Sequence, residues 1–436
     1  MKWCLSLADK TEFDDRFKAM PEHSNLRHFK TKVSELSQTT GKEHREMEKV
    51  FLGVIAGHLP DGVTAAARAL LEFIYYAQLP THTDMTITWL EHALADFHAR
   101  KHVFIERGAR EHFNINKLHS MLHYAAAIRE LGALDGYNTE SPERLHIDFA
   151  KRAYRATNRN DFVSQMVDYL ERRERVFKFD AYLKWAIPEY GEHDRRQSEA
   201  LITKKSPGWH VAKQSPFKPA SLPCLESVFG VRWFDYALSE FSEKELGRNI
   251  ELAAWDALTI FPKATQYLQD DLTLEAGFTD TFHASPHALM TRLSLERRGK
   301  RFDTVLIQRE RADSSYGIKD HIVGEVRMIF KLPPHCRVDD PLVFVNIFHS
   351  PTSDALPPQP TGMYRVRRRR WPAKYSNHYV GQIFFLSDVR RTCHLIPEFG
   401  GTRRVYSSNS PPALEAYDSF YLNSFLDWHS FLFLQA

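Results

Sequence analysis

The chain has 436 residues, 43% of them hydrophobic and 26% charged, a composition that is typical of globular proteins. This length exceeds what one hydrophobic core usually serves, so we expect two or three domains. The formal net charge of +3 is too small to indicate nucleic-acid binding by itself, and only a local cluster of cations could do so.

The four cysteines lie far apart and form no CxxC pair: Cys4, Cys224, Cys336 and Cys393. Their spacing argues against a disulfide framework and against a zinc finger, and indicates free thiols in a reducing compartment. The sequence holds no apolar run of about 18 residues, and its N-terminal stretch turns acidic before a signal-peptide core could form. We therefore expect a nuclear or cytoplasmic protein with no membrane partner.

Residues 1–110 carry the apolar spacing of successive helices. The pattern predicts helices over Lys42–His58, Val63–Leu79 and Thr83–Arg107, separated by segments that contain proline. Their aromatic and aliphatic residues are expected to form the core of a helical bundle.

A further helix is predicted from Lys117 to Leu131, with Gly132 as its stop signal. His119 and His123 are four residues apart and share one face of this helix. The spacing suits two metal ligands, and His146 could complete a set of three if the helices pack suitably. No HExxH glutamate accompanies the pair, so we favour two hydrogen-bonded histidines over a zinc site.

The next helix is predicted to begin at Pro142, because proline is favoured at the first helical position. Arg144, Lys151 and Arg155 fall within about 40° of one another on this helix, opposite its apolar face. Such a stripe is either a solvated surface or a set of phosphate contacts, and the residues alone leave both open.

The helical pattern continues through residues 160–186 and then stops. Residues 188–223 are rich in proline and carry the basic pairs Arg195-Arg196 and Lys204-Lys205. This composition predicts a linker, with a basic arm that touches DNA phosphates as the alternative. Residues 224–300 are expected to form a mixed connector with a helix over Ser242–Ala257.

From Phe302 the hydrophobic period shortens towards two. The β-branched and aromatic runs FDTVLIQRE, HIVGEVRMIFKL, PLVFVNIFH, MYRVR, HYVGQIFFLSDV and RTCHLIP predict at least five strands. They are expected to form an antiparallel β-barrel or sandwich in a separate domain, residues 301–436. The aromatic C-terminus SFYLNSFLDWHSFLFL is expected to pack over an open end of the sheet.

The densest positive cluster of the chain lies within this β-rich region and comprises Arg365, Arg367, Arg368, Arg369 and Arg370, followed by Trp371. Arginines beside an aromatic ring are typical of nucleic-acid-binding surfaces. Side chains alternate between the two faces of a strand, so these arginines cannot all be buried. A solvent-exposed loop without a ligand is the plainer interpretation.

Several stretches of the sequence resemble one known family. These are NLRHFKTKVSELSQTTGKEHREMEKVFLGVIAG, LLEFIYYAQ, an LHxxxHY helix, DGYNTESPERLHIDFAKRAYRATN, HLIPEFG and FYLNSFLDWH. Together they resemble the C-terminal part of fungal Plavaka-type DNA transposases, which are related to the CACTA group. The resemblance implies an α+β protein in which residues 1–187 supply the helical insertion and last helix of an RNase H-like fold.

The resemblance also implies a catalytic role. The family carries a DDE triad of metal-binding acids, and Glu143 is the better match for the third acid, with Glu140 as the second choice. A carboxylate at this helix start is favoured by the helix dipole alone, so the residues by themselves do not require catalysis. The other two acids of the family belong to segments that precede Lys2-Trp3-Cys4.

We therefore expect a C-terminal fragment with an incomplete catalytic centre, because a pair of Mg²⁺ ions requires several carboxylates. Mg²⁺ is the cofactor of intact family members, and none is expected for this chain alone. Replacement acids are disfavoured, since none lies on an evident strand before the helices: Asp14-Asp15, Asp135, Asp148 and Asp270-Asp271.

Three functions remain open at this stage. The chain is expected to be a transposase-derived protein that retains affinity for double-stranded DNA such as transposon ends. The alternatives are an active transposase subunit, completed by another chain in a dimeric or split assembly or by further N-terminal sequence, and a host interaction protein without a nucleic-acid role.

Overall fold

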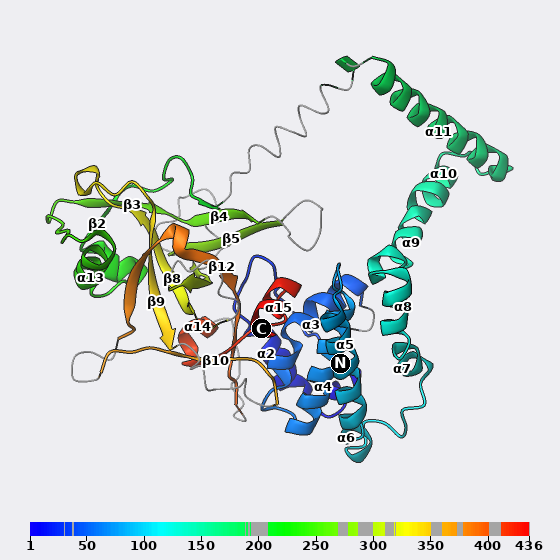
Figure 1. The fold of residues 1–436 in the computed structure, drawn as a ribbon, viewed down its shortest axis with the longest axis horizontal. Coiled ribbons are helices and arrows are strands. Elements are labelled where there is room, and N and C mark those ends of the chain that lie inside the picture. The colour runs from blue at the N-terminus through cyan, green and yellow to red at the C-terminus, as the bar shows by residue number, and fades with distance from the viewer. Residues whose placement is uncertain are drawn as a thin grey trace. The chain divides into compact units, whose positions relative to one another are not determined.

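A computed structural model of the chain combines helices with antiparallel sheets in an α+β architecture (Figure 1). It describes residues 1–29, 31–36, 39–187, 189–190, 192, 208–268, 278–286, 300–309, 318, 320–349, 360–372, 378–400 and 411–435. Arg195-Arg196, Lys204-Lys205 and Asp270-Asp271 lie outside the described residues, as do the side chains of Glu140 and Ser141.

The chain forms two compact units. Unit 1 comprises Met1–Ala125 together with Gly208–Ala436, and unit 2 comprises Ala126–Pro207. This division differs from boundaries drawn by composition at residues 187, 223 and 300. The reason is that the N-terminal helices and the strands share buried contacts that composition does not reveal.

The helices of residues 1–131 are α1 (Lys2–Leu5), α2 (Lys10–Lys18), α3 (Gly41–Ile55), α4 (Asp61–Ala77), α5 (Asp84–Arg100), α6 (Val103–Glu106), α7 (Asn116–Met121) and α8 (Tyr124–Leu131). Local chemistry explains the start of α3, where Thr40 and Glu43 form a reciprocal capping box. The structure confirms the predicted helices at α3, α4 and α5, but it breaks the helix predicted over Lys117–Leu131 into α7 and α8.

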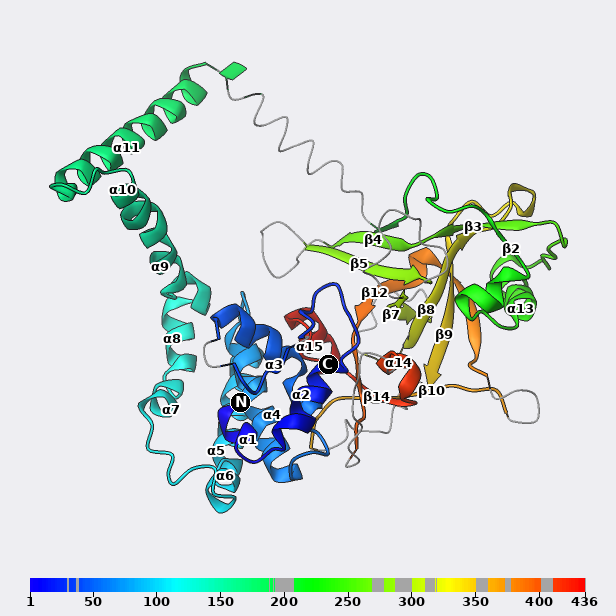
Figure 2. The same ribbon diagram turned by 180° about the vertical axis from the view of Figure 1, so that it is seen from behind.

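Long-range contacts tie these helices to the C-terminal part of unit 1. The buried guanidinium of Arg16 donates hydrogen bonds to the carbonyl oxygens of Val54 (3.0 Å), Ala56 (2.8 Å) and Gly400 (2.7 Å). The ring of Tyr76 on α4 lies 4.8 Å from that of Phe431 on α15 (Trp428–Gln435). Figure 2 accordingly shows α15 beside α3 and α2.

The larger sheet is built around one long antiparallel pair, β8 (His321–Lys331) and β9 (Leu342–His349). Its other strands are β2 (Ala220–Ser221), β3 (Ala257–Phe261), β7 (Thr304–Gln308), β10 (Arg365–Arg368), β11 (Gly381–Phe385), β12 (Val389–Cys393), β13 (Leu395–Pro397) and β14 (Ser419–Leu422). The outer edge of β8 pairs with β7 and β3, and that of β9 pairs with β11 and β10. In the described part of the chain β12 and β13 end the strand order without pairing with each other, so the sheet does not close into a barrel.

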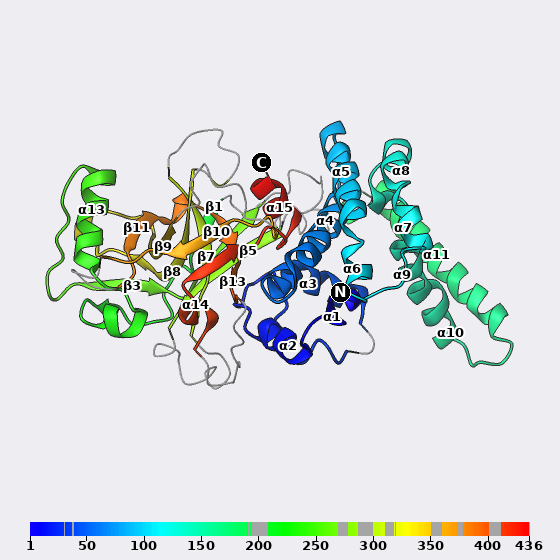
Figure 3. The ribbon, with the colours of Figure 1, turned by 90° about the horizontal axis from the view of Figure 1, so that it is seen from below.

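A smaller sheet of β1 (Gly208–His210), β4 (Lys263–Leu268), β5 (Phe278–Ser285) and β6 (Arg301–Phe302) packs on one face of the larger one. Between them lies an apolar cluster that includes Phe282, Val305 and Val345. A second cluster packs α13 (Phe234–Leu246) on the other face, near β9 and β11 (Figure 3). A third cluster joins β10 and β14 to α14 (Ala413–Ala416) and α15.

Two predictions in this region need correction. No helix covers Ser242–Ala257: α13 ends at Leu246, where Gly247 adopts a left-handed conformation with φ of +63°, and Ala257 begins β3. Strands also begin well before Phe302, because β1, β3, β4 and β5 precede it. The predicted runs from Phe302 onwards do contain β7 to β13, while the aromatic C-terminus supplies both β14 and α15.

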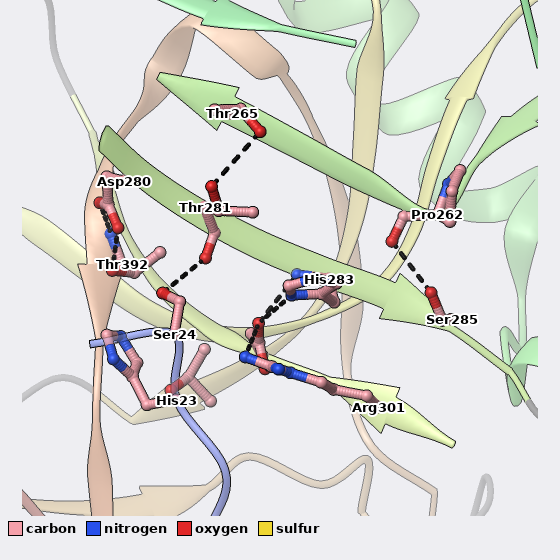
Figure 4. A network of polar contacts seen from close by, with 12 residues as sticks. His23, Ser24, Pro262, Thr265, Asp280, Thr281, His283, Ser285, Arg301 and Thr392 are labelled. Atoms are coloured by element: carbon pink, nitrogen blue, oxygen red, sulfur yellow. Dashed lines mark hydrogen bonds and ion pairs between the residues drawn. The ribbon is translucent and has the colours of Figure 1, made fainter. Parts of the chain in front are cut away.

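The loop after α2 enters a polar network between the two sheets (Figure 4). Ser24 donates to the Thr281 carbonyl (2.9 Å), and Asp280 accepts from the backbone and hydroxyl of Thr392 (2.8 and 2.6 Å). Buried His394 contacts the Pro21 carbonyl through Nε2 (3.1 Å) and the Asn423 amide through Nδ1 (3.2 Å), which suits a neutral ring protonated at Nε2. Burial lowers the pKa of His394 to about 3.

Acidification is therefore expected to destabilise unit 1. The folded-state pKa of His394 lies below the value of about 6.5 in an unfolded chain, so the unfolded chain binds more protons and stability falls as the pH drops below about 6.5. His394 alone accounts for roughly 2 kcal/mol between pH 7 and pH 5. Urea denaturation at the two pH values measures the change. The free energy of unfolding should depend less on pH in His394→Gln than in the unmutated protein, whereas the exposed His102→Gln should leave this dependence unchanged. The same change in unfolding free energy between pH 7 and pH 5 in all three proteins would contradict the prediction.

Candidate nucleic-acid interface

The structure divides the arginine cluster of β10 between the two faces of the sheet. Arg365, Arg367 and Arg369 are exposed, whereas Val366 and Arg368 are buried. This alternation is the two-residue period of a strand. We call the three exposed residues, Arg365, Arg367 and Arg369, the β10 strip.

The members of the β10 strip differ in how far their charge is already neutralised. Arg365 forms an ion pair of 2.5 Å with Glu398. Arg367 and Arg369 take part in no ion pair within the part of the chain that the structure describes, and the strand neighbours of Arg367 are His349 and Ser419. The strip therefore presents two cations without an ion-pair partner among the described residues, one on β10 and one directly after its end.

Arg368 points to the opposite face and is held in the core of the sheet. Its guanidinium donates to Glu325 on β8 at 2.8 Å and also to the carbonyl oxygen of Leu414. Arg327 donates to the other carboxylate oxygen of Glu325 at 3.1 Å. The side chains of Arg368 and Glu325 are each only 2% exposed. Arg368 therefore cannot contact a duplex that lies on the outer face of β10.

The two arginines keep Glu325 ionised despite its burial. Burial raises the pKa of this carboxyl, but the charges of Arg368 and Arg327 and their hydrogen bonds outweigh it, so the pKa lies below its ordinary value. A buried carboxylate without such partners would be strongly destabilising. Arg370 is nearer the surface, where it pairs with exposed Asp418 at 2.6 Å.

The second predicted interface lies in unit 2, on α9 (Glu140–His146), the π-helical segment η2 (Ile147–Lys151) and α10 (Arg152–Arg155). Arg144, Lys151 and Arg155 are all exposed there. The helix begins at Glu140 rather than Pro142. The π-helical turns of η2 hold more residues than α-helical turns, so the angles between Arg144, Lys151 and Arg155 differ from those calculated for a regular α-helix.

Glu143 is exposed near the start of α9, where the hydroxyl of Thr139 contacts its carboxylate at 3.5 Å. Glu140 is the first residue of the same helix. Apolar residues that follow Glu143 are half exposed: Leu145 (49%), Ile147 (45%) and Phe149 (49%). Glu143 therefore lies on a helix with uncovered apolar surface.

His119 and His123 do meet, with their Nε2 atoms 3.4 Å apart at the exposed surface of unit 1, whereas His146 belongs to unit 2. Among the described residues, no three His, Cys, Asp or Glu side chains are grouped so that they could hold a metal ion. The candidate replacement acids have other partners: Asp14 accepts from Ser34 (2.6 Å), and Asp148 pairs with Arg152 (2.7 Å).

Comparison of the chain with protein-family models, with curated proteins and with solved structures finds no match. In the part of the chain that the structure describes, no helix is both long enough and apolar enough to cross a membrane.

Sequence reasoning missed the role of Glu325, although a signal was present. In HIVGEVRMIFKL this glutamate stands alone among β-branched and aromatic residues in a predicted strand. A carboxylate in a strand buried on both faces requires a cationic partner, and the inward arginine of RVRR is one candidate. Only the pairing of β8 and β10 through β9 brings Glu325 and Arg368 together.

Glu325→Gln is expected to destabilise unit 1 by about 3–5 kcal/mol at neutral pH, because it leaves the buried guanidinium of Arg368 and the partly buried one of Arg327 short of their counter-charge. The pKa of Glu325 is depressed, so its stabilisation exists above about pH 4 and is lost as the pH falls through the folded-state value. Urea denaturation should therefore show that the difference in unfolding free energy between Glu325→Gln and the unmutated protein becomes smaller at acidic pH.

Asp418→Asn is the matched control, since it breaks an arginine pair whose carboxylate side chain is 66% exposed. Its cost should stay below about 1 kcal/mol. Equal losses of unfolding free energy in the two variants would show that the buried ion pairs of Glu325 stabilise the fold no more than a surface ion pair does.

Proposed function

We propose that this chain is a transposase-derived protein that binds double-stranded DNA through the β10 strip. The observation that carries the proposal is the exposure of Arg367 on β10 and of Arg369 directly after it, without a carboxylate partner among the described residues. The resemblance to Plavaka-type transposases supplies the choice of DNA as the partner and favours a nuclear location.

Electrostatics supports this use of the strip. Each arginine that neutralises a phosphate releases condensed counterions, so binding through a few such contacts is strongly salt-dependent and independent of sequence. Because the strand is held on both sides by β9 and β14, the two guanidinium groups start from a rigid backbone. Rigid placement lowers the entropic cost of binding.

The stripe residues of unit 2, Arg144, Lys151 and Arg155, are proposed as additional phosphate contacts. The family fold, an RNase H-like core with Glu143 as its third acid and a β-sandwich at the C-terminus, belongs to the same proposal. Face-to-face packing of two antiparallel sheets supports the sandwich. The described residues do not fit a magnesium centre around Glu143, and we derive no catalytic step from it.

Reversing the charge of the strip with Arg367→Glu and Arg369→Glu is expected to weaken duplex binding by about tenfold or more at low salt, since two phosphate contacts become repulsive. Fluorescence anisotropy with a labelled duplex, repeated over a range of salt concentrations, measures this. The salt dependence should also become shallower by about two units of slope.

Two controls sharpen the measurement. Arg107→Glu with Lys213→Glu reverses two exposed cations outside the strip, and Glu143→Gln alters the matched catalytic residue. Both should bind duplex DNA more tightly than the strip variant does. Indistinguishable affinities for all of these proteins would remove the β10 strip from the proposal.

Strand cleavage gives a separate test. The 436-residue polypeptide is expected to show no Mg²⁺-dependent nicking of supercoiled DNA, because a two-metal centre needs several convergent carboxylates. Cleavage that survives stringent purification and disappears in Glu143→Gln would overturn this expectation.

A second candidate function is an active transposase subunit whose other acids come from another chain or from further sequence. The uncovered apolar residues beside Glu143, namely Leu145, Ile147 and Phe149, favour it, because such a surface is suited to packing against another protein layer. Light scattering that detects a self-associated species, lost in Phe149→Ser, would support a homo-oligomer. The remaining alternative, a host interaction protein, predicts no salt-dependent DNA binding at all.

A further inference from the structure

A cavity of about 340 Å³ opens on the face of the larger sheet opposite the β10 strip. It lies between the apolar cluster under α13 and the one under α14 and α15. Its polar lining includes Arg232, Glu325, Arg327, Arg368, Arg370 and His378. This volume is within the range of pockets that hold small ligands or single nucleotides.

The arginines of the cavity outnumber its carboxylates. Four arginines face two glutamates, Glu325 and Glu415, in the lining. Among the described residues, Arg232 pairs with Glu226, Arg370 with Asp418 and Lys300 with Glu415. Counting these three partners leaves one positive charge in excess among the described groups. The Nε atom of Arg368 is buried and has no hydrogen-bond partner within the described structure. An anion is therefore the ligand that complements this lining.

Backbone geometry adapts to the arginines. Gly230 has a φ of +68°, and a Cβ atom there would lie 2.8 Å from a terminal nitrogen of Arg327. Arg327 is also stacked 3.8 Å from the ring centroid of Phe302 and donates to the Phe229 carbonyl at 2.8 Å. The guanidinium is thus fixed before any ligand arrives, as a preorganised anion site requires.

Aromatic residues follow two of these arginines in the sequence. Trp233 follows Arg232 and is 57% exposed, and Trp371 follows Arg370. Tyr236, which is 55% exposed, lies edge-on to Trp371 with ring centroids 5.7 Å apart. We call Trp233, Tyr236 and Trp371 the aromatic rim. Aromatic rings near arginines are the combination that holds bases and phosphates of unpaired strands.

We infer that this cavity binds single-stranded nucleic acid, with a phosphate among its arginines and bases stacked on the aromatic rim. The inference rests on the proposed function for its choice of nucleic acid, but it uses the opposite face of β10 from the duplex-binding strip. A duplex cannot use this site, because its bases are already stacked on each other. The two faces of one strand thus serve two forms of DNA.

Anisotropy of a labelled oligo-dT of about 15 nucleotides tests the inference, with a duplex measured alongside. Arg232→Gln with Trp233→Ala changes two partly exposed residues of the site and should weaken oligo-dT binding by about tenfold, while duplex affinity changes less than about twofold. Oligo-dT should also quench tryptophan emission less in this variant. Lys213→Gln with Trp255→Ala, an exposed pair outside the site, is the matched control and should bind as the unmutated protein does.

The outcomes separate the two ideas. Unchanged oligo-dT affinity in the Arg232/Trp233 variant overturns the inference, whereas unchanged duplex affinity in the β10 strip variant overturns the proposed function. Thymidine monophosphate should displace oligo-dT at a lower concentration than inorganic phosphate does, because its base can stack on the rim. Equal displacement by both would mean that the site takes a bare phosphate and would refute the role of the aromatic rim, and failure of both to displace oligo-dT would refute the phosphate site.

Discussion

The buried ion pairs of Glu325 with Arg368 and Arg327 are the constraint on which the β-rich part of the molecule depends. A carboxylate that is 2% exposed in the middle of a sheet is tolerable only while both guanidinium groups remain in place. Arg368 must therefore face inward. Since a strand alternates its side chains, this fixes Arg367 and Arg369 on the outer face, and a slip of one residue would bury them in place of Arg368.

The same interaction explains why one short arginine-rich run serves two surfaces. On the outer face β10 presents cations that the described residues leave largely unneutralised. On the inner face, Arg368 and Arg370 lie near Arg327 of β8 and Arg232 of the loop before α13. Carboxylates neutralise part of the positive charge there and so reduce the repulsion between the arginines. A bound anion can neutralise the remaining positive charge, because the arginines that line the cavity outnumber its carboxylates.

Sequence patterns predicted the individual helices and strands of this protein better than the way in which they pack together. Helical spacing placed α3, α4 and α5, and alternation placed β7 to β10, because each signal is local. The prediction of a helix over Ser242–Ala257 was wrong, because Ala257 begins a strand that pairs with segments far away in the sequence. The arginine run was visible as a cluster, but which arginines are buried depends on Glu325, which is 43 residues away from Arg368. The union of residues 1–125 with the β-rich part likewise rests on contacts such as Arg16 to Gly400.

Units 1 and 2 differ in how well their apolar surface is covered, and this difference bears on Glu143. Most of the large apolar side chains that the described residues expose belong to residues 122–190, including Val176 (68%) and Trp185 (80%) on α11 (Phe162–Ala186). A helix gains most of its stability in water by burying such a face, and α11 has none of its residues buried. The helices of unit 2 would therefore gain stability by packing against a partner surface, and Glu143 lies beside apolar residues that such a surface would cover.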